Sequence, residues 1–283
     1  MKKIWALVLA VLMVATLSVG LASCGKSSDW KKIEKNGKFI CGITLYAPMN
    51  YYDANGDLVE DESGTLIGFD TELAKLVAEK LGVEVEFQII EWGNKYTELQ
   101  SGAIDCIWNG FTSNSKDSDG IARSEKVDFT HAYLDNKQCV IVKTDRLGEF
   151  TSAAALSGKK AGAESGSAGE SYAKDAGAVI EAAKTSQMAV FTDLKANTVD
   201  FVVVDRLLAD SIVGKGDYAD LSIVSAIDID AEVYSIGCRK GSDFDEKINE
   251  ALVALLNEGK IEELATKYNV RVTDSLMAMK TAK

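Results

Sequence analysis

A repeated segment constrains the fold of this 283-residue chain more than any other feature. Residues 99–110 (LQSGAIDCIWNG) align without a gap with residues 194–205 (LKANTVDFVVVD). Each segment has the pattern of a helix end, a turn, an Ile-Asp or Val-Asp pair and a hydrophobic strand that ends in polar residues. Gly37 and Gly158 each precede a lysine that starts a strand, which adds a second echo in the same order. Chance similarity of βα units explains two ordered echoes poorly, so the sequence predicts two α/β lobes of similar plan.

Strand and helix alternate through both halves, which is typical of a parallel sheet covered on both faces. The apolar spacing predicts strands at residues 38–45, 83–90, 159–163 and 199–204, and helices at 70–81, 94–101, 170–175, 187–196, 242–257 and 260–268. Asn55-Gly56-Asp57 predicts a hairpin turn between two short strands.

The start of the chain has the features of an export signal. Lys2 and Lys3 precede an uncharged apolar run over residues 4–19, and small residues come just before Cys24. We therefore expect residues 1–23 to be a signal peptide and residues 24–36 to be a tether. A plain signal peptide or a membrane-spanning anchor is the alternative.

Charge and residue usage exclude several classes of function. A formal net charge of -12 argues against nucleic-acid binding. His131 is the only histidine and no C-x-x-C occurs, so we expect no metal site and no cofactor. No nucleophile–base pair or nucleotide-binding glycine loop emerges, so an enzyme is not expected. The spacing of Cys41, Cys106, Cys139 and Cys238 leaves both buried thiols and disulfides open.

Polar and aromatic residues gather where the predicted strands end, which is where open α/β sheets bind ligands. They are Tyr46, Trp92, residues 110–112, residues 164–169 and Asp205, with Arg123 in the loop that follows Thr112.

This set suits a zwitterionic amino acid. Arg123 and the turn at residues 165–169, which leads into a helix, can hold an α-carboxylate. Asp205 can hold an α-ammonium, and Tyr46 and Trp92 can sandwich the side chain. Each has a structural alternative: core packing for the two aromatics, a simple turn at 165–169, and helix capping by Asp205.

Several motifs together resemble family 3 of the bacterial solute-binding proteins, the polar amino-acid receptors of ABC importers. The motifs are G-F-D-T-E-L from Gly68, N-G-F-T from Asn109, R-S-E-K-V-D-F from Arg123, E-S-G-S-A from Glu164 and the helical ending over residues 245–269. The resemblance extends over roughly residues 37–270.

The resemblance implies a two-lobed, periplasmic-binding-protein-like α/β fold of type II, in which each lobe is a β-sheet flanked by helices. Lobe 1 would contain residues 37–134 and 236–283, lobe 2 residues 135–235, and two crossing strands would form the hinge. The segment before Cys24 also resembles a lipobox, which implies a lipid anchor on that cysteine. We therefore expect a monomer tethered outside the bacterial cytoplasmic membrane, which delivers an L-amino acid to a permease.

The resemblance also assigns roles in the site. Arg123 would bind the ligand carboxylate, Asp205 the ammonium, and two aromatic residues would flank the side chain. The full predicted set is Tyr46, Trp92, Gly110, Phe111, Thr112, Arg123, Glu164, Ser167, Ala168 and Asp205.

Three departures from the family pattern bear on the ligand. About six extra residues separate Thr112 from Arg123, and an apolar residue, Ile43 or Leu45, replaces a frequent acidic position. Glu164 stands where the glutamine receptor has a lysine, which favours a polar or cationic ligand side chain. Two other functions stay open: a dehydratase of the cyclohexadienyl dehydratase type on the same fold, and an amino-acid sensor module.

Overall fold

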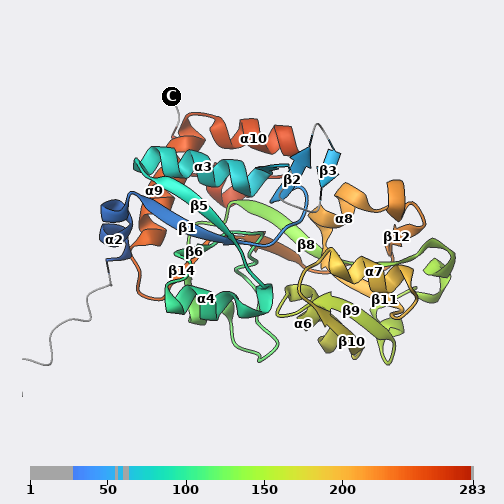
Figure 1. The fold of residues 1–283 in the computed structure, drawn as a ribbon. Helices are drawn as coiled ribbons and strands as arrows, with labels where there is room; N and C mark the ends of the chain where they lie inside the picture. The colour runs from blue at the N-terminus through green and yellow to red at the C-terminus, as the bar shows by residue number, and fades with distance from the viewer. Residues whose placement is uncertain (1–27, 55–56, 60–63, 282–283) are drawn as a thin grey trace, which may run out of the picture.

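The alternating strands and helices form two separate β-sheets, one in each lobe (Figure 1). The computed structural model describes residues 28–54, 57–59 and 64–281. The predicted signal peptide and Cys24 therefore lie outside the described residues. The two sheets with their helices confirm the two-lobed α/β architecture that the repeated segment predicts.

The sheet of lobe 1 has the strand order β5-β1-β6-β14-β7. Its strands are β1 (Lys38–Ile43), β5 (Glu84–Ile89), β6 (Cys106–Ile107), β7 (Val127–Phe129) and β14 (Gly237–Arg239). β1 runs parallel to β5 and β6, whereas β14 is antiparallel to β6 and β7. The parallel strands place Tyr46, Trp92 and Gly110 after strand ends at the same edge of the sheet.

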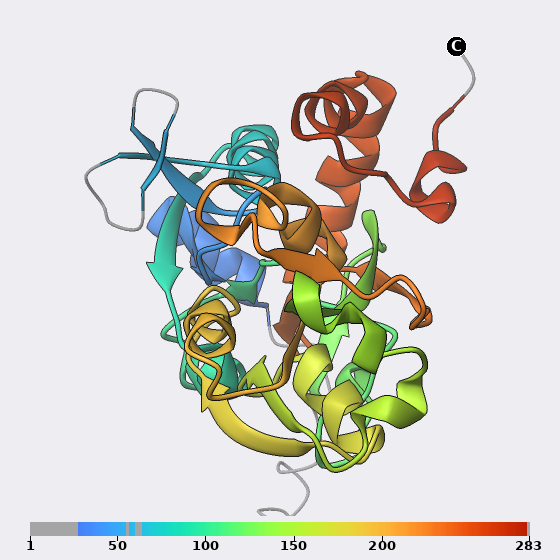
Figure 2. The ribbon, with the colours of Figure 1, turned by 90° about the vertical axis from the view of Figure 1, so that its right-hand side faces the viewer.

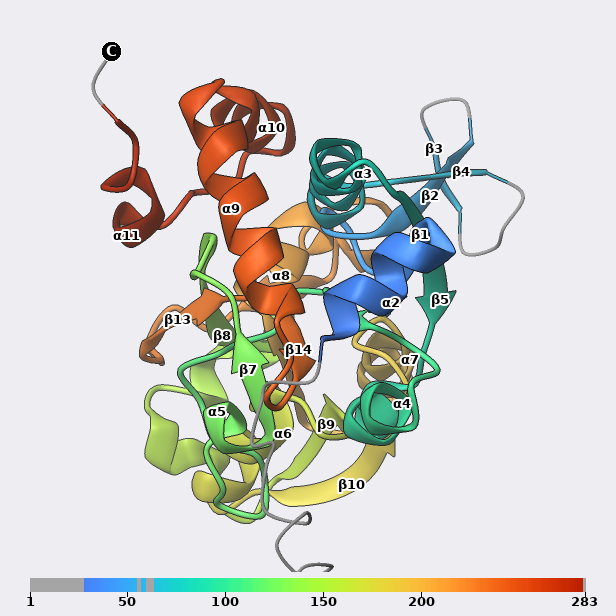
Figure 3. The same ribbon diagram turned by 90° about the vertical axis from the view of Figure 1, so that its left-hand side faces the viewer.

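Helices cover this sheet in the pattern that the apolar spacing predicts. They are α3 (Phe69–Leu81), α4 (Lys95–Ser101), α9 (Phe244–Asn257), α10 (Lys260–Tyr268) and α11 (Asp274–Met277). α3, α9 and α10 pack against one another (Figure 3). Leu73 and Val77 of α3 are buried, and Gly82 ends that helix in the left-handed conformation that glycine adopts readily.

Residues 29–36 correct the prediction of a tether over 24–36. They form helix α2 (Asp29–Asn36), which Ser28 caps by accepting a hydrogen bond from the Lys31 amide. Ile33 is buried, and the ring of Trp30 stacks on Phe244 of α9 at 6.3 Å. The two apolar residues share one helix face, three residues apart, so burying that face stabilises the helix against lobe 1.

The sheet of lobe 2 has the order β10-β9-β11-β8-β12, and β13 also pairs with β8. Its strands are β8 (Leu134–Lys143), β9 (Lys160–Glu164), β10 (Val179–Lys184), β11 (Phe201–Asp205), β12 (Leu221–Ile223) and β13 (Ala231–Tyr234). The helices α6 (Ala168–Asp175), α7 (Ala189–Lys195) and α8 (Arg206–Ile212) belong to this lobe. β9 and β11 are parallel, so Glu164 and Asp205 lie at neighbouring strand ends.

A third, small sheet projects from lobe 1 beside α3, as Figures 2 and 3 both show. It contains β2 (Tyr51–Ala54), β3 (Asp57–Val59) and β4 (Thr65–Ile67) in the order β3-β2-β4. β2 and β3 pair antiparallel, as the predicted hairpin requires, although Asn55 and Gly56 of the turn lie outside the described residues.

The chain passes between the lobes twice, and the two passages lie side by side. β8 leaves lobe 1 after Leu134, and β13 returns at Tyr234; these two residues are partners in an antiparallel pair. Two adjacent extended segments are a geometry that permits hinge motion between lobes.

The four described cysteines are buried and free. Cys41, Cys106 and Cys238 are successive partners across the lobe 1 sheet, and Cys139 lies in lobe 2. The structure therefore favours buried thiols over a disulfide framework. Across the described part of the chain, no helix is both long enough and apolar enough to span a membrane.

Candidate functional site

The predicted site residues converge on a small cavity between the lobes, which we call the inner cavity. Its volume is about 10 Å³, enough for one water molecule. Its lining residues come from both lobes: Trp92, Asn109, Gly110, Thr112 and Arg123 from lobe 1, and Glu164, Ser167, Ala168, Gln187 and Asp205 from lobe 2. Of the predicted set, Tyr46 and Phe111 are not part of this lining.

Arg123 begins the short helix α5 (Arg123–Lys126) and is only 1% exposed. Its Nε donates to Oδ1 of Asp117 at 2.9 Å, and its Nη1 donates to the Thr112 carbonyl at 3.2 Å. Its Nη2 crosses to lobe 2 and donates to the Gly166 carbonyl at 3.3 Å. Carboxylate and carbonyl partners on the sides of the guanidinium fix its orientation at the cavity wall.

Asp117 gives a role to the extra segment 113–122. Besides Arg123, its carboxylate accepts hydrogen bonds from Lys126 Nζ at 2.8 Å and from the Tyr96 hydroxyl at 2.7 Å. Burial alone would raise the pKa of Asp117, but Arg123 and Lys126 hold it below the ordinary value. The insertion therefore supplies the charged partner of the arginine that it separates from Thr112.

Phe111 lies behind the guanidinium instead of in the cavity. The Arg123 Cζ is 5.2 Å from the centre of the Phe111 ring, and the Trp92 ring meets the same ring edge-on at 5.2 Å. Gly237 of β14 makes room for it, because a Cβ there would lie 2.8 Å from a Phe111 ring carbon. In this structure the Phe111 ring is a platform for Arg123, and its contact with a ligand stays a prediction.

Lys95 is a second buried cation on the lobe 1 side, 1% exposed. Its Nζ donates to the Trp92 carbonyl at 3.3 Å and to the Gly166 carbonyl of lobe 2 at 3.0 Å. It also lies 4.9 Å from the ring centre of Trp92 and 4.7 Å from that of Tyr96. Burial, reinforced by the charge of Arg123, lowers the pKa of Lys95 to about 7.

Asp205 is the central carboxylate of lobe 2, and neutral amides hold it. Asn136 donates to Oδ1 at 3.0 Å and Gln138 donates to the same oxygen at 2.5 Å, while Gln187 donates to Oδ2. Burial raises the pKa of Asp205 despite these hydrogen bonds. Asp205 precedes α8 directly, but its side chain makes no capping hydrogen bond to that helix, so capping does not account for it.

Two further carboxylates lie close to Asp205. Glu164 is 2% exposed, and its Oε1 has no hydrogen-bond partner among the described residues. Burial and the charge of Asp205 raise the pKa of Glu164 well above its ordinary value. Glu232 accepts from Gln138 at 2.9 Å and from the Thr112 hydroxyl at 3.1 Å. Burial, with the charge of Asp205, raises the pKa of Glu232 to about 7.

Gly110 is held in a conformation that favours glycine, with φ of 55°. A Cβ at this position would lie 1.9 Å from the Tyr46 hydroxyl oxygen and 3.0 Å from the Tyr234 ring. The Gly110 amide donates to Oδ2 of Asp70 at 2.9 Å. Asp70 and Tyr46 thus position the peptide that follows β6, although Tyr46 itself faces a different cavity.

The turn at residues 165–169 combines a helix cap with a carbonyl that faces cations. Ser167 caps α6 by accepting from the Glu170 amide at 3.0 Å, and the Gly166 amide donates to Oε2 of Glu170 at 2.8 Å. The Gly166 carbonyl accepts hydrogen bonds from both Lys95 and Arg123. Ser167 and Ala168 line the inner cavity, and the Gly166 carbonyl also joins the lobes.

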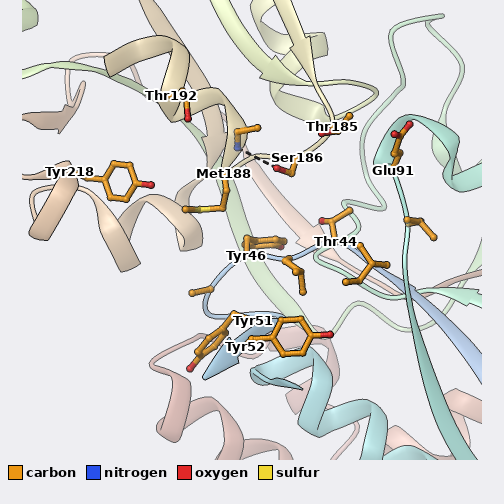
Figure 4. A pocket seen from close by; sticks show the side chains of 15 residues that line it. Thr44, Tyr46, Tyr51, Tyr52, Glu91, Thr185, Ser186, Met188, Thr192 and Tyr218 are labelled. Atoms are coloured by element: carbon orange, nitrogen blue, oxygen red, sulfur yellow. Dashed lines mark hydrogen bonds between the residues drawn. The ribbon is translucent and has the colours of Figure 1, made fainter. Parts of the chain in front are cut away.

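A larger cavity of about 600 Å³ lies beside the inner one, and Tyr46 is part of its wall (Figure 4). We call it the outer chamber. Residues of both lobes line it, among them Glu91 of lobe 1 and Ser186 of lobe 2.

Sequence reasoning missed Lys95, Asp117, Gln138, Gln187 and Glu232. A lysine on a short helix is normally exposed, so nothing in the pattern marks Lys95 as buried. Gln138 had a usable signal: Asn136 and Gln138 repeat at the two-residue period of a strand and so share one face of β8. No group of three or more His, Cys, Asp or Glu side chains is placed to hold a metal ion in the part of the chain that the structure describes.

Comparison with protein families gives a match over most of the chain. The family model described as bacterial extracellular solute-binding proteins, family 3, matches residues 40–271. The arginine-binding extracellular protein ArtP of Bacillus subtilis is 27% identical, over 92% of this chain and 96% of the relative. The L-cystine-binding protein TcyJ of Escherichia coli is 26% identical, over 92% of each.

Solved structures agree with the fold. A substrate-binding protein of an ABC uptake transporter from Streptococcus pneumoniae with bound histidine has a TM-score of 0.72, at 29% identity over 86% of this chain and 96% of that one. An ancestral arginine-binding protein bound to arginine has a TM-score of 0.70, at 32% identity over 82% and 98%. An ancestral amino-acid-binding protein, a precursor of cyclohexadienyl dehydratase, has a TM-score of 0.70, at 26% identity over 85% and 99%.

Proposed function

Because this chain belongs to family 3 of the bacterial extracellular solute-binding proteins, we propose that it binds a free L-amino acid with a cationic side chain between its lobes. We further propose that it delivers this ligand to the permease of an ABC importer. The family is extracytoplasmic, which fits the export signal. We propose that Cys24 carries the lipid anchor and that the protein acts as a monomer.

The observation that carries the proposal is the segregation of charge across the inner cavity. Lobe 1 presents the Arg123 guanidinium, which suits an α-carboxylate, and lobe 2 presents Asp205, which suits an α-ammonium. Glu164 adds a second buried carboxylate with an oxygen that no described residue satisfies. A buried, unsatisfied acceptor is costly, so a ligand side chain that donates there gains affinity over one that does not.

The related proteins support an amino-acid ligand. The relatives include an arginine-binding and a cystine-binding protein, and solved relatives hold histidine or arginine. The choice of a cationic side chain for this chain rests on Glu164 and on the excess of carboxylates on the lobe 2 wall.

Binding requires the lobes to separate, because an inner cavity of about 10 Å³ is smaller than any amino acid. The adjacent strands β8 and β13 are the passages that would flex. Rejoining the lobes would then bury the ligand between Arg123 and Asp205.

A thermal-shift panel of the natural L-amino acids tests this function. A ligand that binds only the folded protein stabilises it by RT ln(1 + [L]/Kd), so at least one cationic L-amino acid should raise Tm. Its D-enantiomer and the Arg123→Ala variant should give no shift. A complete panel without any shift contradicts the proposal.

A dehydratase is the second candidate, because a precursor of cyclohexadienyl dehydratase shares the fold and Glu164 is a buried acid. A protonated carboxyl group can act as a general acid. Incubating the protein with prephenate or arogenate and following the product by NMR separates the two functions. We expect no turnover; turnover that Glu164→Gln abolishes would support the enzyme instead.

A further inference from the structure

The outer chamber is large enough for part of a small molecule. Its volume of about 600 Å³ lies within the roughly 300–1,000 Å³ that ligand pockets span. It is lined by residues 44–47, 51–52 and 89–91 of lobe 1 and by residues 185, 186, 188, 189, 192 and 218 of lobe 2. In Figure 4 the Tyr46 ring lies between Met188 on one side and Tyr51 and Tyr52 on the other.

Residues that are adjacent in the sequence line different cavities, one the outer chamber and the next the inner cavity. Glu91 lines the chamber and Trp92 the inner cavity, and the same holds for Ser186 and Gln187. Thr44 of the chamber accepts a hydrogen bond through its carbonyl from Asn109 of the inner cavity, at 2.8 Å. The two spaces therefore share walls on both lobes.

Tyr46 connects the two spaces directly. Its backbone and ring line the chamber, while its hydroxyl reaches the Gly110 peptide of the inner cavity. A long side chain that starts beside Gly110 would run along the Tyr46 ring into the chamber. Aromatic faces favour both alkyl stems and planar cations, so this wall accepts either.

The wall chemistry of the chamber favours a positively charged group. Its lining contains Glu91, an exposed residue whose Oε2 accepts a hydrogen bond from Asn94 at 3.1 Å, together with Ser186 and three tyrosines, Tyr51, Tyr52 and Tyr218. None of the described lining residues is a lysine, an arginine or a histidine. A second carboxylate on the ligand would have no cation there, which disfavours acidic and doubly zwitterionic ligands.

We propose that the outer chamber is the subsite for the distal end of the ligand and that it selects a long side chain ending in a guanidinium or ammonium group. This inference rests on the proposed function, since it places the α-amino-acid end in the inner cavity. Glu91 is the carboxylate that recognises the distal cation, in addition to the carboxylate of Glu164 in the inner cavity, and the tyrosine rings pack against the stem and the cation.

L-Arginine and L-citrulline test the subsite, because they share length and shape and differ in charge at the distal end. Calorimetric titration should give arginine a preference of about tenfold or more, the effect of one charge-assisted contact. Glu91→Gln should reduce this preference about fivefold or more and leave citrulline affinity unchanged. Glu79→Gln, an exposed glutamate on α3 away from the chamber, is the matched control and should change neither.

A second variant tests the space itself. Ala189 lines the chamber, and Ala189→Phe should fill part of it. The variant should weaken arginine about tenfold or more and spare L-2,3-diaminopropionate, whose short cation stays within the inner cavity.

The outcomes separate the subsite from the function as a whole. If Glu91→Gln and Ala189→Phe both leave the arginine affinity and the arginine preference unchanged, the subsite is wrong, while arginine binding itself still supports the proposed function. If no amino acid binds the native protein, the proposed function fails and the subsite fails with it.

Discussion

The two walls of the inner cavity bury charges of opposite sign and stabilise them differently. On lobe 1, Arg123 has an ionic partner, Asp117, within the same lobe. On lobe 2, neutral amides donate to Asp205 and no cation pairs with it within the described residues, while Oε1 of Glu164 has no hydrogen-bond partner there.

The difference indicates which part of the ligand contributes most to recognition. Arg123 already has an ionic partner, so a ligand carboxylate adds little binding free energy there. Asp205 has no such partner, so its desolvation cost is still uncompensated and a ligand ammonium adds more. The lobe 2 wall should therefore dominate affinity, and the lobe 1 wall should fix orientation.

Removing the charge of Asp205 should have the largest effect. Asp205→Asn keeps the shape but leaves a buried ligand ammonium without its carboxylate, which costs about 2–5 kcal/mol. We expect L-arginine affinity to fall by more than about 100-fold in calorimetric titration. Asp210→Asn, at an exposed position of α8, is the control and should bind as the native protein does. A loss below about threefold for Asp205→Asn would show that the ammonium lies elsewhere.

Lys95 should make the lobe 1 wall more stable at high pH. Its folded pKa of about 7 lies below the ordinary lysine value of 10.5, so the unfolded chain binds more protons between these values. The free energy of unfolding should rise as pH increases from about 7 to 10, and Lys95→Met should lack about 2 kcal/mol of this rise. Denaturant titrations at several pH values measure it, with the exposed Lys31→Met as control. Parallel curves for native and Lys95→Met would contradict the prediction.

Glu232 should give the lobe 2 wall the opposite dependence. Its folded pKa of about 7 exceeds the ordinary value of 4.5 because of burial and the charge of Asp205. Its contribution to stability is complete below pH 4.5 and is lost as pH rises through about 7. The free energy of unfolding of Glu232→Gln should therefore fall by on the order of 1 kcal/mol less than that of the native protein between pH 4.5 and about 7. This magnitude allows for solvent screening, because the side chain is partly exposed. If the free energy of unfolding of Glu232→Gln fell as steeply with pH as that of the native protein, the two walls would not differ in their pH dependence as predicted.

The smallest expected effect on affinity, with the closest control, comes from two aspartates of the extra segment 113–122. Asp117 and Asp119 both accept from Lys126, but only Asp117 reaches Arg123. Asp117→Asn should weaken arginine binding about fivefold to tenfold, because the guanidinium loses the partner that orients it. Asp119→Asn should change the affinity less than about twofold. Equal effects of the two variants would mean that the insertion acts only through Lys126.

The elements that sequence predicts well are those whose signal is local. The apolar spacing of α3 and the glycine after it place that helix within a residue of its observed start. The repeated segment correctly predicts β11, but β6 is only two residues long. Helix α2 escaped prediction because its stability depends on Trp30 packing against Phe244, a residue more than 200 positions away.

In the candidate site, too, local signals allow prediction and long-range contacts do not. Glu164 and Asp205 lie at neighbouring strand ends and line one cavity with Arg123, because parallel strands present their ends at one edge of a sheet. The packing of Phe111 against Arg123 could not be predicted, because the sequence does not show that Gly237 leaves space for the ring. Asp117 could not be paired with Arg123, since that contact depends on how the insertion folds back. The roles of the site residues in binding stay predictions.

The contribution of the two walls is tested most directly with two arginine analogues that each lack one end of the zwitterion. Agmatine lacks the α-carboxylate and 5-guanidinopentanoate lacks the α-ammonium. Calorimetry on the native protein should show both binding more weakly than L-arginine, with 5-guanidinopentanoate weaker by more than about 100-fold and agmatine by less. Asp205→Asn should not weaken 5-guanidinopentanoate further. If 5-guanidinopentanoate binds as tightly as L-arginine, the lobe 2 wall does not recognise the ammonium, which contradicts its dominant role in affinity.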